Sequence, residues 1–577
     1  MMDKQAAHAD DLEVASQPHD ATSKALHDEA LVSGAKHASD AEQHMTLLRA
    51  VKLYPKAIGW SVLLSSTLIM EGYDLALLGS LYASPVFNQK YGTWDEANEK
   101  WAVSAAWQSG LSNGARAGEI IGLILAGWVS DRYGYKRTTI MSLILMILFV
   151  FVLFFAPNVQ VLVVGEVLCG IPWGAFQSVT PAYASEVAPV VLRPYLTTFI
   201  NMCWVIGQFF AAAVNKGSVG RHDEWAYRIP FGVQWVWPVP ILAGVLFAPE
   251  SPWWHVRHGN RDAAKASLLR LTSRDDPTFN PDDTIAMIEH TNELEKSMKE
   301  GLTYRDCFKG VDLRRTEIVV GIWLVQTLGG QNLMGYFAYF LTQAGMDASN
   351  SFSLSMGQYA LGMVGTAGSW FLMSRVGRRT IHFSGLCCQL IILIIVGSLA
   401  FAGSNGSIWA IGAMLIVFTF VYDFTVGPVT YSLISELSST RLKAKTIVLA
   451  RAAYNASNIF VNVMTNYQLS SGAWNWGAKT AYFWAGTCLL STVWVFFRLP
   501  EPKGKLGPTQ QVLFDPGSTD LAFHIGRSYA ELDLLFEHRV PARKFAKTKI
   551  DPYTLSQDNN IKRVSTEKDA IEAEKEL

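Results

Sequence analysis

Long apolar runs alternate with short polar segments over most of the chain. Four runs contain no Asp, Glu, Lys or Arg, at residues 138–156, 229–249, 381–403 and 480–497. Eight less pure runs fall at about 54–83, 105–129, 160–186, 194–215, 316–344, 352–374, 408–436 and 444–468. About 20 helical residues cross about 30 Å of hydrocarbon. The pattern therefore predicts twelve membrane-spanning helices, six on either side of a polar insert.

The same pattern divides the chain into five regions. They are an N-terminal tail (1–53), a six-helix half (54–250), an insert (251–315), a second six-helix half (316–498) and a C-terminal tail (499–577). Within the insert, apolar residues at Ala264, Leu268, Leu269 and Leu271 predict short amphipathic helices. The tails are polar, and we expect them to be disordered and suited to the control of trafficking.

The composition supports a membrane protein. Half of the residues are hydrophobic (50%) and only 17% are charged, whereas a soluble domain carries about a quarter charged residues. The net charge of −1 gives no basic patch for nucleic acid. The six cysteines show no CxxC spacing, so neither a disulfide framework nor a metal site is expected. The polar N-terminus argues against a cleaved secretory signal.

Lysine and arginine are distributed unevenly over the predicted loops. The loops after the second, fourth, eighth and tenth runs are basic, as is the insert, and the loops between them hold few positive charges. Positive charge is retained on the cytoplasmic side of a membrane. We therefore expect both termini and the insert to be cytoplasmic.

The two halves repeat each other. Gly134 and Gly377 lie 243 residues apart, Glu186 and Glu436 lie 250 apart, and the Pro-Glu pairs ending at Glu250 and Glu501 lie 251 apart. Similar offsets at three predicted helix ends indicate a parallel internal duplication. Two six-helix halves around a midplane site are the architecture of a secondary transporter.

Eight motifs in order along residues 54–504 resemble the sugar porter branch of the major facilitator superfamily. They are Gly72-Tyr-Asp74, DRYGYKR at 131–137, Glu186 with Arg193, the Pro-Glu-Ser-Pro at 249–252, Gln326 with Gly330 and Asn332, Gly377-Arg-Arg379, Glu436 with Arg441, and the Pro-Glu-Pro-Lys-Gly at 500–504. Within that branch, Met70-Glu-Gly-Tyr-Asp74 and Gln89-Lys-Tyr-Gly92 are similar to fungal α-glucoside (maltose-type) proton symporters.

Three carboxylates lie inside predicted spans. Glu71 and Asp74 are three residues apart on one helix face, and Glu166 stands in a charge-free stretch of the fourth run. A charge at mid-membrane costs roughly 2.5 kcal/mol or more, so such residues are functional candidates. Carboxylates that share a low-dielectric site favour each other's protonated form, which suits proton coupling. Alternatively, Glu71 or Glu166 pairs with Arg116, or either reaches the headgroups.

The resemblance makes Asp74 the expected proton carrier. Proton-coupled sugar porters usually have Phe at the position of Glu71 and Arg at that of Glu166. Maltose-type permeases are similar to this chain in carrying both extra acids. The departure therefore favours that subgroup over passive facilitators.

Sugar binding requires amides, hydroxyls and an aromatic face. By resemblance, Gln326, Asn332 and Tyr336 have the family's spacing for sugar contacts. The same resemblance assigns Asn201 and Gln208, and it indicates that Thr327 replaces a Gln and Tyr431 a Trp, which would fit a different or larger sugar. Asn455 and Asn458 are weaker candidates. The alternative for all of these residues is hydrogen bonding between helices.

Charged residues at the predicted cytoplasmic helix ends suggest a gate of ion pairs between the halves that must break for inward opening. Its candidates are Arg132, Arg137, Glu186, Arg193, Glu250, Arg378, Arg379, Glu436 and Arg441. Topology signals alone would explain the arginines but not the glutamates.

The sequence thus predicts an all-α membrane protein with the major facilitator fold and cytoplasmic helices between its halves. We expect a monomeric proton-coupled symporter in the plasma membrane of a fungus-like cell, importing an α-glucoside disaccharide such as maltose by alternating access, with sugar, protons and lipid as its partners and no cofactor. A hexose carrier of the same family and a non-transporting sugar sensor are the alternatives. An enzyme is disfavoured because the chain lacks a His/Cys cluster, a Gly-rich phosphate loop and a paired nucleophile and base.

Overall fold

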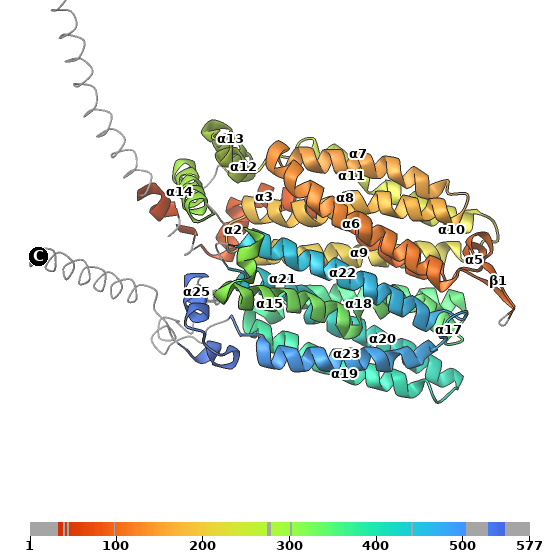
Figure 1. The fold of residues 1–577 in the computed structure, drawn as a ribbon. Helices are drawn as coiled ribbons and strands as arrows, with labels where there is room; N and C mark the ends of the chain where they lie inside the picture. Colours follow the sequence, from red (N-terminus) through yellow and green to blue (C-terminus); the bar gives the residue numbers. More distant parts are fainter. Residues whose placement is uncertain are drawn as a thin grey trace, which may run out of the picture.

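Each of the twelve predicted runs is helical in the computed structural model. The structure describes residues 33–38, 41–42, 45–96, 99–273, 279–299, 303–439, 442–502 and 529–548. Figure 1 shows the long helices lying roughly parallel to one axis, with the N-terminal half (orange to yellow) beside the C-terminal half (green to blue). The fold is therefore that of an all-α membrane protein made of two helical halves.

The N-terminal half contains α3 (Pro55–Ser65) with α4 (Thr67–Leu81), α6 (Ala105–Tyr133), α7 (Tyr135–Phe154), α8 (Val159–Val187), α9 (Arg193–Ser218), and α10 (Trp225–Val233) with η1 (Gln234–Val236) and α11 (Pro238–Val245). The C-terminal half contains α15 (Gly310–Gln326) with η3 (Thr327–Gln331), α16 (Asn332–Gly335) and α17 (Phe337–Gln343), α18 (Ala348–Arg375), α19 (Arg378–Leu399), α20 (Asn405–Phe424) with α21 (Val426–Leu437), α22 (Lys443–Leu469) and α23 (Thr480–Arg498). The halves meet where α6 packs on α22 and α9 packs on α18.

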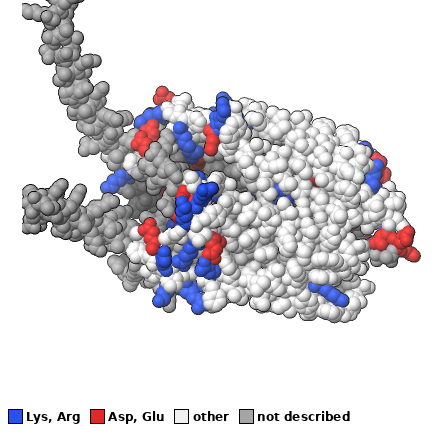
Figure 2. All heavy atoms as spheres, viewed as in Figure 1, with Lys and Arg blue, Asp and Glu red and all other residues white. Residues whose placement is uncertain are grey.

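The outer surface of the bundle is apolar. Large side chains such as Ile124, Leu148, Phe371 and Leu490 are exposed on it. Seven helices of the described chain are long and apolar enough to cross a membrane by length and composition. Charged side chains gather at one end of the bundle in Figure 2, with a few at the opposite end. An apolar belt between charged ends fits a bilayer.

Four of the predicted runs are broken helices. The chain turns at Ser66 between α3 and α4, at η1 between α10 and α11, through η3 after α15, and at Thr425 between α20 and α21. Gly330 in η3 has φ +90°, a left-handed conformation that side chains with a Cβ rarely adopt. Broken helices expose backbone and aim side chains into the interior, an arrangement that is found in secondary transporters.

The helices of the N-terminal half approach each other closely at glycines. A Cβ on Gly72 of α4 would lie 2.8 Å from the Cα of Trp204 in α9 and closer still to its carbonyl oxygen. Gly207 of α9 meets the backbone of Ile69 and Tyr73 in the same way. This contact fixes α4, which carries two of the predicted acids, against α9.

Short elements cap both ends of the bundle. The charged end carries α2 (Leu47–Leu53), α12 (Pro252–Arg257), α13 (Arg261–Leu271), α14 (Pro281–Lys299) and η2 (Tyr304–Phe308). The predicted amphipathic helices of the insert are confirmed, since Ala264, Leu268 and Leu271 are buried. The opposite end carries α5 (Pro85–Tyr91) and an antiparallel hairpin of β1 (Thr93–Asp95) and β2 (Lys100–Ala102), and η4 (Gly477–Lys479) precedes α23.

The prediction of disordered tails is wrong for the parts of the tails that the structure describes. In the N-terminal tail, α2 buries Ala50 and Leu53. In the C-terminal tail, α25 (Tyr529–Glu537) and the 3-10 helix η5 (Ala542–Lys547) bury Phe536 and Phe545. The guanidinium of Arg315 lies 4.6 Å from the ring centre of Phe536, which ties the segment to α15. Burial of aromatic side chains offsets the entropy of ordering them.

Candidate functional site

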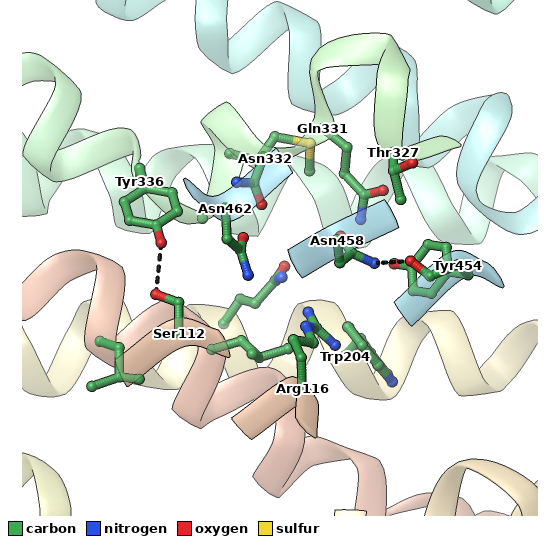
Figure 3. A pocket seen from close by; sticks show the side chains of 15 residues that line it. Ser112, Arg116, Trp204, Thr327, Gln331, Asn332, Tyr336, Tyr454, Asn458 and Asn462 are labelled. Carbon is green, nitrogen blue, oxygen red and sulfur yellow. Dashed lines mark hydrogen bonds between the residues drawn. The ribbon is translucent and has the colours of Figure 1, made fainter. Parts of the chain in front are cut away.

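A cavity of about 70 Å³, partly open to solvent, lies between the two halves. Its walls come from α4, α6 and α9 on one side and from η3, α16 and α22 on the other. Figure 3 shows the polar side chains of both halves converging on it. The lining residues are Leu75, Leu78, Ser112, Arg116, Trp204, Gln208, Thr327, Gln331, Asn332, Met334, Gly335, Tyr336, Tyr454, Asn458 and Asn462.

Five of the nine predicted sugar-contacting residues line this cavity: Gln208, Thr327, Asn332, Tyr336 and the weaker candidate Asn458. The break after α15 places three of them, because η3 and α16 turn the chain so that these side chains face α22. Thr327 bonds the Ser457 hydroxyl at 2.9 Å, and Asn332 donates to Thr465 at 3.1 Å. The two contacts fix this segment at two points along α22.

The other four predicted sugar residues lie behind the cavity wall. The amide of Asn201 donates to Thr366 at 3.3 Å and to Asp423 at 3.4 Å, across the seam between the halves. Tyr431 packs edge-on against Trp323, with ring centres 5.3 Å apart. Their assignment to sugar stays a prediction that this arrangement does not favour.

The remaining two are buried amides. Gln326 is 4% exposed, and its amide oxygen has no hydrogen-bond partner in the part of the chain that the structure describes. Asn455 is fully buried, and neither atom of its amide has a hydrogen-bond partner among the described residues.

Several cavity residues were missed from the sequence. On α22, Tyr454 and Asn462 lie four residues before and after the predicted Asn458, and this spacing was the signal that could have found them. Trp204 lies one turn before Gln208 on α9 and supplies an aromatic face. These residues are polar or aromatic, as a sugar site requires.

Asp74 and Glu166 form a pair of carboxyls next to the cavity helices. Both are 0% exposed and close enough to interact, yet Asp74 Oδ2 and both carboxyl oxygens of Glu166 have no hydrogen-bond partner among the described residues. The Gln234 amide donates to Asp74 Oδ1 at 2.5 Å. A hydrogen bond between two carboxyls needs a proton on one of them. The pair can therefore hold a proton inside the apolar bundle.

Glu71 belongs to a second network that reaches both halves. Its carboxylate accepts a hydrogen bond from Gln177 and lies 4.0 Å from Arg116, whose main partner is Glu119 at 2.8 Å. The predicted alternative of a Glu71–Arg116 pair is thus present as the longer of two contacts. Gln177 in turn accepts from Arg451 of α22 at 2.9 Å.

Arg451 is a charged residue of α22 that the sequence analysis did not single out. Its guanidinium lies 4.7 Å from the ring centres of both Trp323 and Tyr454. Through Gln177 it connects the C-terminal half to Glu71 in the N-terminal half. The aromatic rings hold the cation where no carboxylate is in direct contact among the described pairs.

The halves are joined at the end that carries the β hairpin. The Tyr336 and Ser112 hydroxyls are 2.7 Å apart, and Gln108 donates to the Tyr339 hydroxyl at 3.4 Å. Nearby, the Tyr336 ring stacks on Tyr82 with centres 6.2 Å apart. These contacts close the seam between the halves at that end.

At the charged end, Glu186 pairs with an arginine of the insert and Glu436 pairs with an arginine of its own half. Arg257 pairs with Glu186, which also accepts a hydrogen bond from the Tyr135 hydroxyl at 2.9 Å. Arg378 lies 3.3 Å from Glu436. These pairs involve two of the three glutamates of the predicted gate, and neither pair joins the two six-helix halves.

The other members of the predicted gate have separate surroundings. Arg193 lies 4.0 Å from Glu42 of the N-terminal tail, and Arg132 lies 5.8 Å from the ring centre of Trp128. Arg379 donates to the Phe496 carbonyl at 2.8 Å, while Arg137 is exposed. Arg441 lies outside the described residues. The gate between the halves stays a prediction.

Glu250 and Glu501 occupy equivalent places in the two halves. Glu250 accepts hydrogen bonds from the first backbone N–H groups of α7, at Tyr135 (3.0 Å) and Lys136 (3.1 Å). Glu501 accepts from Arg379 N at 3.1 Å at the start of α19. Burial raises the pKa of Glu250, and the backbone N–H donors lower it. The internal duplication predicted from spacing is thus repeated in three dimensions.

The amino-acid sequence is similar to those of known sugar transporters. The profile described as "Sugar (and other) transporter" matches residues 60–514. Maltose permease MAL31 of Saccharomyces cerevisiae is 41% identical over 537 residues, which covers 92% of this chain and 84% of that protein. The general alpha-glucoside permease of the same yeast is 39% identical over 525 residues, covering 90% and 81%.

Solved structures with the same fold include the xylose transporter XylE from E. coli. Its partially occluded inward-open form superposes with a TM-score of 0.64 at 19% identity, covering 79% of this chain and 100% of that one. The form described as a proton:xylose symporter bound to 6-bromo-6-deoxy-D-glucose gives 0.62 at 20% identity, covering 80% and 99%.

Proposed function

The chain belongs to the sugar (and other) transporter family, and we propose that it is a proton-coupled symporter that imports an α-glucoside disaccharide such as maltose. The observation that carries this proposal is one arrangement. An amide-lined cavity lies at the seam of two helical halves, beside a buried carboxyl pair that can hold a proton.

The cavity suits a neutral sugar. Each sugar hydroxyl both donates and accepts hydrogen bonds, and the side-chain amides of Gln208, Gln331, Asn332 and Asn458 can match both roles. The indole of Trp204 offers a face for the apolar side of a sugar ring. Since Arg116 is paired with Glu119, the site carries little net positive charge for an anionic ligand. The names of the yeast relatives, maltose and alpha-glucoside permeases, point to the same class of sugar.

Coupling is assigned to Asp74 and Glu166. A proton shared by the two carboxyls removes one charge from the bundle interior, where an uncompensated charge is costly. We assign Glu71 to proton coupling as well. A change in the charge of Glu71 alters its contact with Arg116. The same change reaches Arg451 indirectly, because Gln177 hydrogen-bonds both Glu71 and Arg451. Protonation can in this way alter contacts between the two halves.

Alternating access follows from the contacts that join the halves at the hairpin end. Their closure there, together with ion pairs of Glu186 and Glu436 that do not join the two halves, fits a state in which the charged end is the open one. We assign the charged end, with both termini, to the cytoplasm of a cell whose plasma membrane contains the protein, in line with the basic loops. The outward state would then use the predicted gate pairs.

The test is sugar-driven proton uptake in cells that lack other sugar transporters. Adding maltose to cells that express the unaltered chain should alkalinise the medium. One proton moving inward across 100 mV contributes about 2.3 kcal/mol, enough for roughly a fiftyfold sugar gradient. Asp74→Asn should retain maltose exchange but lose accumulation and alkalinisation, whereas the exposed control Asp262→Asn should retain all three. Sugar accumulation without proton uptake in the unaltered chain would reject the coupling, and the absence of any sugar flux would reject transport.

A further inference from the structure

The polar stripe on α22 is longer than one sugar ring. Tyr454, Asn458 and Asn462 all face the cavity in Figure 3. At 1.5 Å per helical residue, the eight steps from Tyr454 to Asn462 cover about 12 Å. That length exceeds a single pyranose ring and matches two rings joined by one glycosidic bond.

The surroundings of the stripe differ at its two ends. Near Tyr454 and Asn458 lie Thr327 and Trp204, and Thr327 is fixed there by its bond to Ser457. Near Asn462 lie Asn332, fixed by its bond to Thr465, and the Tyr336 hydroxyl with Ser112. Each end therefore has its own hydrogen-bonding groups, and Trp204 lies at the first end.

The end at Asn462 also differs in its contact with the other half. Asn462 donates to Asn113 of α6 at 3.3 Å, and Tyr336 meets Ser112 of α6 at 2.7 Å. Both α6 residues belong to the N-terminal half, while Asn462 and Tyr336 belong to the C-terminal half. A sugar ring at this end would touch both halves beside the contacts that close the seam.

We propose that the cavity contains two adjacent sugar subsites along α22, and that Asn462, Ser112 and Tyr336 form the second subsite, which selects two-ring over one-ring α-glucosides. This inference rests on the proposed function. The first subsite, at Asn458, Thr327 and Trp204, binds one glucosyl ring of any substrate. The second binds the other ring of a disaccharide, and a monosaccharide leaves it unused.

The test compares maltose with methyl α-D-glucopyranoside, which has one ring. Inhibition constants of both sugars are measured against labelled maltose exchange, with concentrations of the one-ring compound extending into the high millimolar range. Loss of one hydrogen bond weakens binding by roughly three- to tenfold. Asn462→Ala should weaken maltose binding by that factor and leave the one-ring compound unchanged, whereas Asn458→Ala should weaken both.

Equal weakening of both sugars by Asn462→Ala would overturn the proposal, because an interhelical role for Asn462 affects every substrate alike. An unaltered chain that binds the one-ring compound as tightly as maltose would also overturn it. If Asn462→Ala does not reach the membrane, Asn462→Ser tests the same subsite with the same expected selectivity. An unaltered chain without maltose flux would count against the proposed function, whereas flux with unselective variants counts against the two subsites alone.

Discussion

Gly72 lies where α4 and α9 are in backbone contact, and replacing it with alanine isolates the value of that contact. The new Cβ would lie 2.8 Å from the Cα of Trp204 and 2.9 Å from its carbonyl carbon. Ordinary carbon–carbon contact is about 3.5–4.0 Å, so the helices would have to separate by about 1 Å. The atoms in the way are backbone, which cannot rotate aside as a side chain would.

The expected cost follows from two opposing effects. Overpacking a well-packed interior costs about 1–3 kcal/mol, while replacing glycine by alanine in a helix contributes up to about 1 kcal/mol of stability. Gly59 of α3 provides the matched control, because a Cβ there would meet nothing within 4 Å. Gly59→Ala has only the favourable effect. The two variants should therefore differ by about 1–3 kcal/mol, the overpacking cost itself.

Thermal unfolding of the purified protein in detergent measures this difference. One kcal/mol shifts Tm by about 2–4 °C in a unit of roughly 200 residues, so Gly72→Ala should melt several degrees below Gly59→Ala. Separation of α4 from α9 also moves Asp74 away from Gln234 and Glu166, so maltose-driven proton uptake should fall more in Gly72→Ala than in the control. Equal Tm values and equal uptake in the two variants would refute the close-contact explanation.

Three further changes test other parts of the structure. Arg116→Gln leaves the buried Glu119 carboxylate without its ion pair and should destabilise the protein by about 3–5 kcal/mol. Adding Glu119→Gln should restore part of the lost melting temperature, and no recovery would contradict the pairing. Tyr336→Phe removes the 2.7 Å bond to Ser112 and should shift the equilibrium between the closed and open seam by roughly two- to tenfold. A membrane-impermeant thiol reagent should then label the double variant Tyr336→Phe with Ser109→Cys faster than Ser109→Cys alone. Unchanged labelling would show that the bond does not hold the seam closed. Phe536→Ala removes a fully buried ring and should make residues 529–548 more sensitive to protease than the exposed control Glu537→Ala, while equal digestion would mean that the segment is not held by this ring.

The candidate site was predicted from the sequence in part. The acids Glu71, Asp74 and Glu166 could be found because charge is rare and costly in apolar runs. Their partners could not, because Asp74 meets Glu166 and Gln234 only after helices distant in the chain are packed together. A rare residue can be seen in one dimension, whereas a pair depends on the relative positions of helices.

Amides and one cation illustrate the same limit. Asn201 and Gln208 lie seven residues apart on α9, yet only Gln208 reaches the cavity, while Asn201 faces Asp423 and Thr366. Arg451 lies near the start of the run 444–468, where an arginine is typical of a residue that flanks a loop. Its role depends on Trp323 and Gln177, which belong to other helices. The spacing of residues along a helix shows on which face a residue lies, but it does not show which residues of other helices contact that face.

The twelve helical runs, the insert helices and the duplication could be predicted from the sequence, because these features depend on local hydrophobic patterns and on the thickness of a bilayer. Three features are seen only in the packed structure. They are the positions where the runs break, the polar residues that surround the cavity, and the packing of parts of the tails on the bundle. Breaks such as that at Gly330, and the burial of Phe536 against Arg315, depend on contacts between segments far apart in the chain. Whether such contacts form depends on the free energy of the whole packed arrangement, which no local stretch of sequence determines.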